Sequence, residues 1–133
     1  MRKIKFRGWN KEIKDWVYGD LFHCRISPEN NDGKEEIVTA ILDDNGIAME
    51  VVPESVGQFT GFQDYYKEDI YEGDVLTNRN QDESWTVEWD EDEGYWSAAG
   101  DGVLEELSSI LLTEPWPEVV WAGRLRGTDH GNQ

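Results

Sequence analysis

Apolar and polar residues alternate one by one along much of this chain, and this pattern constrains the fold more than any other feature. It is clearest in residues 85–90, where Trp85, Val87 and Trp89 alternate with polar side chains. Successive side chains of a β-strand point to opposite faces of the sheet, so such a segment predicts a strand with one buried face. The pattern recurs along the chain, and we expect a mainly β protein.

In the first residues, apolar side chains alternate with basic ones. Ile4 and Phe6 alternate with Lys3, Lys5 and Arg7, which predicts a strand with a solvated basic face.

Turn sequences separate the expected strands. Asp43–Gly46 holds Asn-Gly between two apolar runs, which favours a hairpin with a type I′ turn because both residues tolerate a positive φ. Asp90–Gly94 predicts a second hairpin turn. After Asp101, which could cap a helix, apolar residues recur at helical spacing and predict at most one short helix: Val103, Leu104, Leu107, Ile110 and Leu111.

The strands fall into two groups. Those before Pro53 predict a β-rich N-terminal lobe, residues 1–55. Five or six short strands with tight turns follow and predict a small, strongly bent barrel, residues 56–127. Residues 128–133 are expected to be a flexible tail.

Composition indicates a folded, strongly acidic protein. The 133 residues carry 29 acidic and 12 basic side chains, for a formal charge of −17. Seven Trp, five Tyr and four Phe supply the large apolar surfaces that disordered chains lack. No apolar run approaches the roughly 18 residues of a membrane span, and a single cysteine cannot form an internal disulfide. We therefore expect a cytoplasmic protein that does not enter a membrane.

The charges are segregated. Six of the twelve basic residues lie in the first fourteen positions, whereas residues 80–123 hold twelve acidic residues and no Lys or Arg. The basic strand could lie against the acidic half of the same molecule or of a neighbour. A protein partner or self-association is therefore expected, while direct binding to nucleic acid is disfavoured because phosphate contacts need basic side chains.

Few side chains could carry chemistry. His23 and Cys24 are adjacent, so on a strand they point to opposite faces and cannot form a nucleophile–base pair. Cys24 is expected in the core, His23 at the surface or at a sheet edge, and His130 in the tail. One Cys and two His cannot supply the four ligands of a structural zinc site.

Glu72-Gly73-Asp74 is the most site-like motif. Its two acids could act as an acid/base pair or hold a metal for phosphoryl transfer. A backbone corner explains them better, with Gly73 at an unusual backbone angle and Asp74 accepting a backbone N–H. In the same way, Asp90, Asp92 and Glu93 are expected to form a solvated turn rather than a calcium or magnesium site. We predict no catalytic, cofactor-binding or metal-binding residues. Trp116, between two prolines, could be exposed.

Five segments in order resemble the YopX family of phage and prophage proteins. They are IKFRGWNKEIKDWVYGDL (Ile4–Leu21), VVPESVGQFTGFQD (Val51–Asp64), DIYEGDVL (Asp69–Leu76), VEWDEDEG (Val87–Gly94) and PEVVWAGRLRG (Pro117–Gly127). The resemblance implies a phage-encoded protein of the bacterial cytoplasm, β-rich at its N-terminus, with an SH3-like barrel after it. It carries over no catalytic or binding residues.

Three functions follow as hypotheses. The leading one is a non-enzymatic interaction or assembly protein. The alternative is an acidic DNA mimic that occupies the basic cleft of a host nucleic-acid protein, because residues 80–123 are so acidic. The third, a carboxylate-metal hydrolase, lacks a converging set of catalytic residues.

Overall fold

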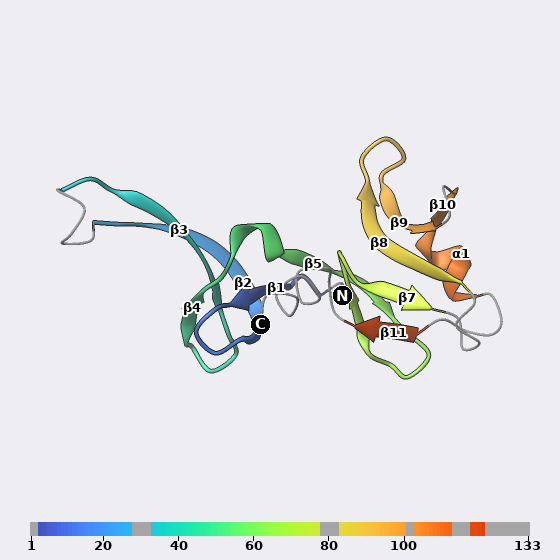
Figure 1. Ribbon diagram of the computed structural model, residues 1–133, viewed down its shortest axis with the longest axis horizontal. Coiled ribbons are helices and arrows are strands. Elements are labelled where there is room, and N and C mark those ends of the chain that lie inside the picture. The colour runs from blue at the N-terminus through green and yellow to red at the C-terminus, as the bar shows by residue number, and fades with distance from the viewer. Residues whose placement is uncertain (1–2, 28–32, 78–82, 101–102, 113–117, 122–133) are drawn as a thin grey trace. The chain divides into compact units, whose positions relative to one another are not determined.

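The computed structural model describes residues 3–27, 33–77, 83–100, 103–112 and 118–121, and these are mainly β, as predicted (Figure 1). Contacts divide the chain into an N-terminal unit, Ile4–Gly57, and a C-terminal unit that begins at Gln58. The expected tail, together with His130, lies outside the described residues. No helix in the described part of the chain is long and apolar enough to cross a membrane.

The N-terminal unit is an antiparallel sheet with the order β4-β3-β2-β1. A single turn of 3-10 helix, η2, follows β4. The elements are β1 (Phe6–Asn10), β2 (Asp15–Ile26), β3 (Glu36–Leu42), β4 (Ala48–Glu50) and η2 (Pro53–Ser55). The long strands β2 and β3 extend past β1 and β4 as a two-stranded ribbon (Figure 1).

The core of this unit is small. Val17, Ile41 and Val51 are buried together. Gly8 is required beside them, because a Cβ at that position would lie 2.7 Å from the side chain of Val51. Four partly buried side chains complete the cluster: Phe6, Leu21, Met49 and Val56.

The expected solvated basic face of the first strand is wrong at Arg7. Arg7 is only 2% exposed, and its guanidinium carbon lies 4.4 Å from the centre of the Trp16 ring. Trp16 in turn packs edge-on against Trp9, with 5.4 Å between the ring centres. The alternation predicted that Arg7 faces solvent. An arginine can instead be buried in an aromatic cluster, because its flat guanidinium stacks on indole.

The predicted hairpin at Asp43–Gly46 is confirmed, but its turn type is wrong. The loop between β3 and β4 runs from Asp43 to Ile47, and within it only Gly46 has a positive φ, of 81°. The Asp43 carboxylate stabilises a different turn, because it accepts the backbone N–H groups of Asn45 and Ile47, each at 2.9 Å. An aspartate at the first turn position favours this arrangement.

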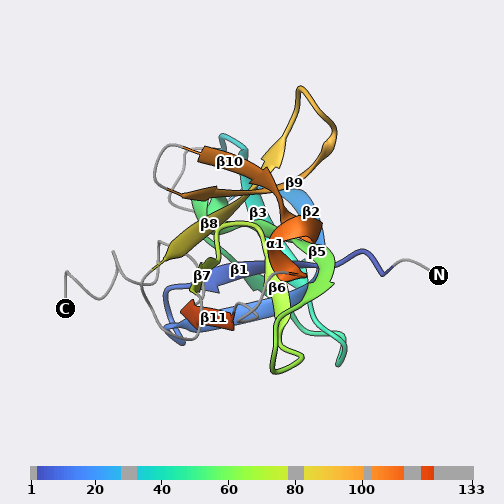
Figure 2. The same ribbon diagram turned by 90° about the vertical axis from the view of Figure 1, so that its right-hand side faces the viewer.

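The C-terminal unit contains the β5–β6 pair and an antiparallel sheet with the order β10-β9-β8-β7-β11. Figure 2 shows β10 beside β9 and the helix α1 that follows it. The elements are β5 (Gly57–Gln63), β6 (Asp69–Tyr71), β7 (Val75–Thr77), β8 (Ser84–Asp90), β9 (Tyr95–Gly100), β10 (Val103–Glu106), α1 (Leu107–Leu111) and β11 (Glu118–Trp121). The described strands form a sheet with β10 and β11 as its edges, and no closed barrel is found among them, which is consistent with the predicted mainly β class.

The one short α-helix is confirmed, but it is shorter than predicted. Val103–Glu106 is a strand that pairs with β9, and α1 begins only at Leu107. The proposed cap, Asp101, lies outside the described residues. Leu107 and Ile110 join the core, where the rest of the cluster is Ile70, Leu76, Val87, Trp96 and Ala98. Leu104 on the strand is 48% exposed, so the apolar spacing did not mark one buried face.

The alternation of β8 is confirmed only in part. Val87 is 1% exposed and Trp85 packs against the core, whereas Trp89 is 42% exposed. Trp89 is paired across the hairpin with Trp96, and their rings meet edge-on with 5.0 Å between centres. An aromatic side chain is thus presented at the end of the hairpin.

Candidate functional site

The Glu72-Gly73-Asp74 motif is a corner that ties three strands together. Gly73 has φ of 93°, and its N–H donates to the Val87 carbonyl at 2.8 Å. Asp74 is 1% exposed, and its Oδ2 accepts the Tyr71 N–H at 2.8 Å. Both features match the predicted scaffold. Glu72 is half-buried beside Gly73, so the two acids stand in different environments.

The two acidic turns are built in the same way. Asp90 Oδ1 accepts the backbone N–H groups of Asp92 and Glu93, at 2.9 and 3.1 Å. Asp43 does the same in the other hairpin. In the described ranges no group of three or more His, Cys, Asp or Glu residues is placed to hold a metal ion.

His23 and Cys24 lie on the β2–β3 ribbon, opposite Thr39 and Val38. His23 is exposed, as expected. Cys24 is half-buried and lies outside the core, so the core prediction is wrong. The reason is its position on β2 beyond the residues that pair with β1, which end at Gly19. Trp116 lies outside the described residues.

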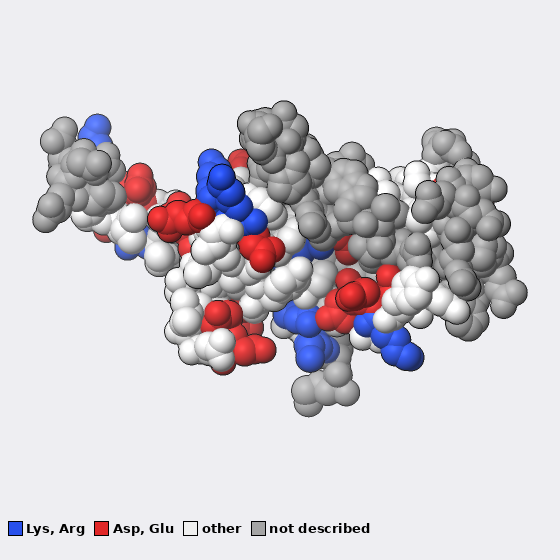
Figure 3. All heavy atoms as spheres, turned by 60° about the horizontal axis from the view of Figure 1, so that its bottom comes forward, with Lys and Arg blue, Asp and Glu red and all other residues white. Residues whose placement is uncertain are grey.

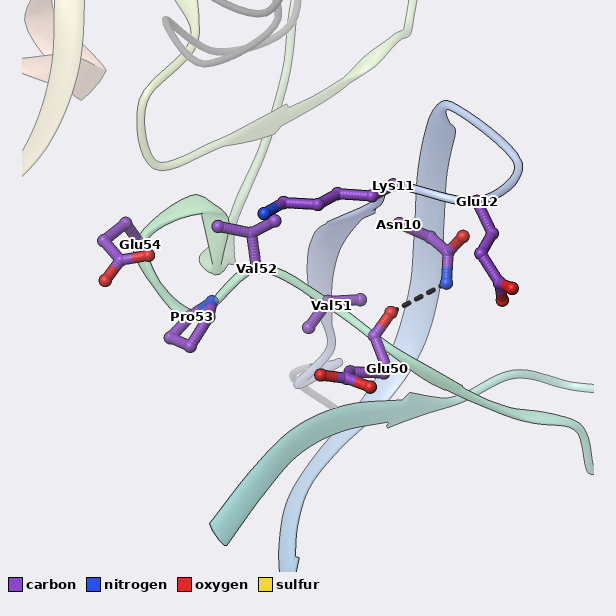
Figure 4. A pocket seen from close by; sticks show the side chains of 8 residues that line it. All are labelled: Asn10, Lys11, Glu12, Glu50, Val51, Val52, Pro53 and Glu54. Atoms are coloured by element: carbon purple, nitrogen blue, oxygen red, sulfur yellow. Dashed lines mark hydrogen bonds between the residues drawn. The ribbon is translucent and has the colours of Figure 1, made fainter. Parts of the chain in front are cut away.

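One hollow of the N-terminal unit, of about 310 Å³, lies between the β1–β2 turn and η2 (Figure 4). Asn10 is fully engaged there, since its Nδ2 donates to the Glu50 carbonyl at 2.8 Å and its Oδ1 accepts the Ile13 N–H. The carboxylates of Glu12, Glu50 and Glu54 point in different directions in Figure 4. This hollow therefore lacks a convergent set of polar groups.

A second hollow, of about 280 Å³, lies in the C-terminal unit where β10 ends beside β9. β10 pairs with β9 only over Ser97–Gly100, and none of the described strands continues along Tyr95 and Trp96 on that edge. We call this the hairpin hollow. Its lining comes from five elements and the β8–β9 turn: Thr60, Phe62, Trp89, Gly94, Tyr95, Trp96, Glu106 and Ser108.

One carboxylate, Glu106, lines the hairpin hollow, and further acids lie near its Tyr95. Asp90 is the cross-strand partner of Tyr95, so both point to the same face of the sheet. Ser97 lies on that face as well, between Glu88 on one side and Glu106 on the other. Partial burial raises the pKa of the Tyr95 hydroxyl, and Glu93, Asp90 and Glu106 raise it further, because an anionic phenolate would be repelled there.

Exposed acidic side chains follow β8, the β8–β9 turn and β10. Seven carboxylates are exposed in this part of the chain: Glu83, Glu88, Glu91, Asp92, Glu93, Glu105 and Glu106. No basic residue occurs between positions 80 and 123 to offset them. We call these seven residues the acidic surface. On the face that Figure 3 shows, acidic and basic side chains both occur over the N-terminal unit.

Sequence patterns predicted the acidity but not the hairpin hollow. Trp89 and Trp96 each stand two residues from the turn residues 91–94, and this spacing is the signal that could have found their contact. Phe62 and Glu106 reach the hollow from distant parts of the chain, so only the folded structure brings them there.

These features define a mainly β protein of two units with an acidic and aromatic surface on its C-terminal unit. The model of the YopX protein family matches residues 5–114, and the chain belongs to this family. No curated protein matches the chain significantly.

Proposed function

We propose that this chain is a phage- or prophage-encoded protein that works by binding another protein and not by catalysis, and that its partner presents a basic surface. The observation that carries the proposal is the acidic surface, in which seven exposed carboxylates have no basic residue among them. Such a surface attracts a basic partner over long range and repels acidic ones.

The DNA-mimic function is the more specific form of this proposal. The same acidic surface would favour it if the basic surface of the partner were a DNA-binding site. The unbroken run without Lys or Arg supports it, since any exposed cation would lower the resemblance to a row of phosphates.

Capture from a bacterial lysate tests both. The variant Glu91→Gln/Asp92→Asn/Glu93→Gln removes three exposed charges and keeps the Asp90 side chain that holds the turn. We expect it to lower recovery of a basic partner roughly tenfold at low salt. The matched control, Glu12→Gln/Asp44→Asn/Glu54→Gln, removes three exposed charges from the N-terminal unit and should leave recovery unchanged.

The outcomes separate the two forms. A captured partner that duplex DNA displaces supports the DNA mimic, and one that DNA leaves in place supports binding of another kind. Equal recovery with the two triple variants would contradict the proposed role of the acidic surface.

Self-association is the other partner expected from the sequence, through addition of a strand to an open sheet edge. In the described part of the N-terminal sheet, β4 is such an edge. Light scattering at low salt should then give a mass above that of the 15.4 kDa chain. A strictly monomeric mass over the concentration range of the experiment would contradict this prediction.

A further inference from the structure

We propose that the hairpin hollow binds the side chain of an arginine on the basic partner. The inference rests on the proposed function and names the group that the acidic surface recognises. It combines three features of the hollow: its size, its aromatic walls and the carboxylates around it.

The size of the hollow suits one side chain. Its volume is about 280 Å³, just below the roughly 300–1,000 Å³ of pockets that enclose drug-sized ligands. A cofactor or nucleotide would not be enclosed. A long, thin side chain could enter past the end of β10, along the edge of β9 that no described strand covers.

The walls suit a cation with a flat face. Trp89 is 42% exposed, and its ring meets the ring of the buried Trp96 edge-on. Phe62 and Tyr95 add two more rings. Aromatic faces attract cations, with Trp the strongest, and a guanidinium can stack on them as a plane.

The charge of the hollow selects a cation over any anion or neutral group. Glu106 lines it, and the Ser108 hydroxyl donates to Glu106 Oε2 at 2.9 Å, which orients the carboxylate. Asp90 and Glu93 stand close enough to Tyr95 to act on its hydroxyl. A guanidinium can make paired hydrogen bonds to a carboxylate while it stacks on indole, which an ammonium cannot do.

The experiment titrates the full chain with three capped peptides of six residues in which glycine alternates with arginine, lysine or citrulline. Citrulline keeps the shape of arginine without its charge. The indole N–H signals of the seven Trp residues are followed by NMR, and Trp89→Phe assigns the signal of Trp89. We expect the Trp89 signal to shift most, and the affinity to fall in the order arginine, lysine, citrulline.

Two neighbouring acids provide the matched variants. Glu106 lines the hollow, whereas Glu105 is exposed on the same strand and does not line it. Glu106→Gln should weaken arginine-peptide binding about fivefold to tenfold, and Glu105→Gln less than twofold. Trp89→Ala should weaken it about tenfold, whereas Tyr18→Ala removes an aromatic ring of similar exposure from the N-terminal unit and should have no effect.

Several results would overturn the inference: equal affinity for the citrulline or lysine peptide, or equal effects of the two glutamate variants. If Trp89→Ala fails to fold, the two glutamate variants and the three peptides still test whether the hairpin hollow binds arginine. The proposed function fails separately, when the Glu91/Asp92/Glu93 variant and its control recover equal amounts of partner. If the triple variant loses capture but Glu106→Gln and Glu105→Gln have equal effects, the proposed role of the acidic surface is supported and arginine binding in the hairpin hollow is contradicted.

Discussion

Replacing Asp74 by alanine is expected to lower the free energy of unfolding by about 2–3 kcal/mol. The side chain is 1% exposed, and its Oδ2 accepts the Tyr71 N–H, which alanine would leave buried without that acceptor. The backbone of Asp74 also pairs with Tyr71 and Val87, so strain at the corner would reach both strands. Urea denaturation followed by tryptophan fluorescence measures the loss as a lower midpoint.

Two variants of the same corner serve as controls. Asp74→Asn keeps an oxygen that can accept the Tyr71 N–H and should be less destabilising than alanine. Glu72→Ala should be less destabilising than Asp74→Ala, because Glu72 is only half-buried whereas Asp74 is 1% exposed. If Asp74→Ala costs no more than Glu72→Ala, the corner does not depend on the Asp74 carboxyl group.

Replacing Gly19 by alanine, in the N-terminal unit, is expected to lower the free energy of unfolding by about 2–3 kcal/mol. A Cβ at Gly19 would collide with the carbonyl oxygen of Leu42, and φ of 155° already lies where side chains are strained. The clash is with backbone, so no rotation of a side chain can relieve it. Hydrogen exchange should show faster exchange in β2 and β3, and less change in the C-terminal unit.

Gly46 supplies the matched control for Gly19. It also has a positive φ, of 81°, but nothing lies within 4 Å of the position its Cβ would take. Gly46→Ala should therefore cost only the backbone strain, about 1–2 kcal/mol. Equal costs at the two glycines would mean that the close approach of Leu42 to Gly19 is not significant in solution.

The local features of this fold could be predicted from the sequence because short-range chemistry decides them. The Asp90–Gly94 turn, the Asp43 hairpin and the corner at Gly73 each depend on residues a few positions apart. Asp74 was predictable for the same reason, since the N–H that it accepts is only three residues away.

The predictions that were wrong concern features that depend on contacts between residues distant in the sequence, or on a side chain in an environment unusual for its type. Arg7 follows the alternation of its strand, yet it is buried against Trp16. The spacing of apolar residues after Asp101 matches a helix, but pairing with β9 makes its first four described residues a strand. The hairpin hollow needs Glu106 and Phe62 beside Trp89, and no local pattern brings them together.

The loop that joins β3 and β4 affects how the purified protein ages. Asn-Gly sequences lose ammonia when the glycine nitrogen attacks the asparagine side chain. Here the Gly46 N–H donates to the Asp43 carbonyl at 3.0 Å, and Asp43 also holds the N–H of Asn45. The nitrogen is thus restrained from the attack, and deamidation at Asn45 should be slower in the folded protein than in an unfolded peptide of the same sequence.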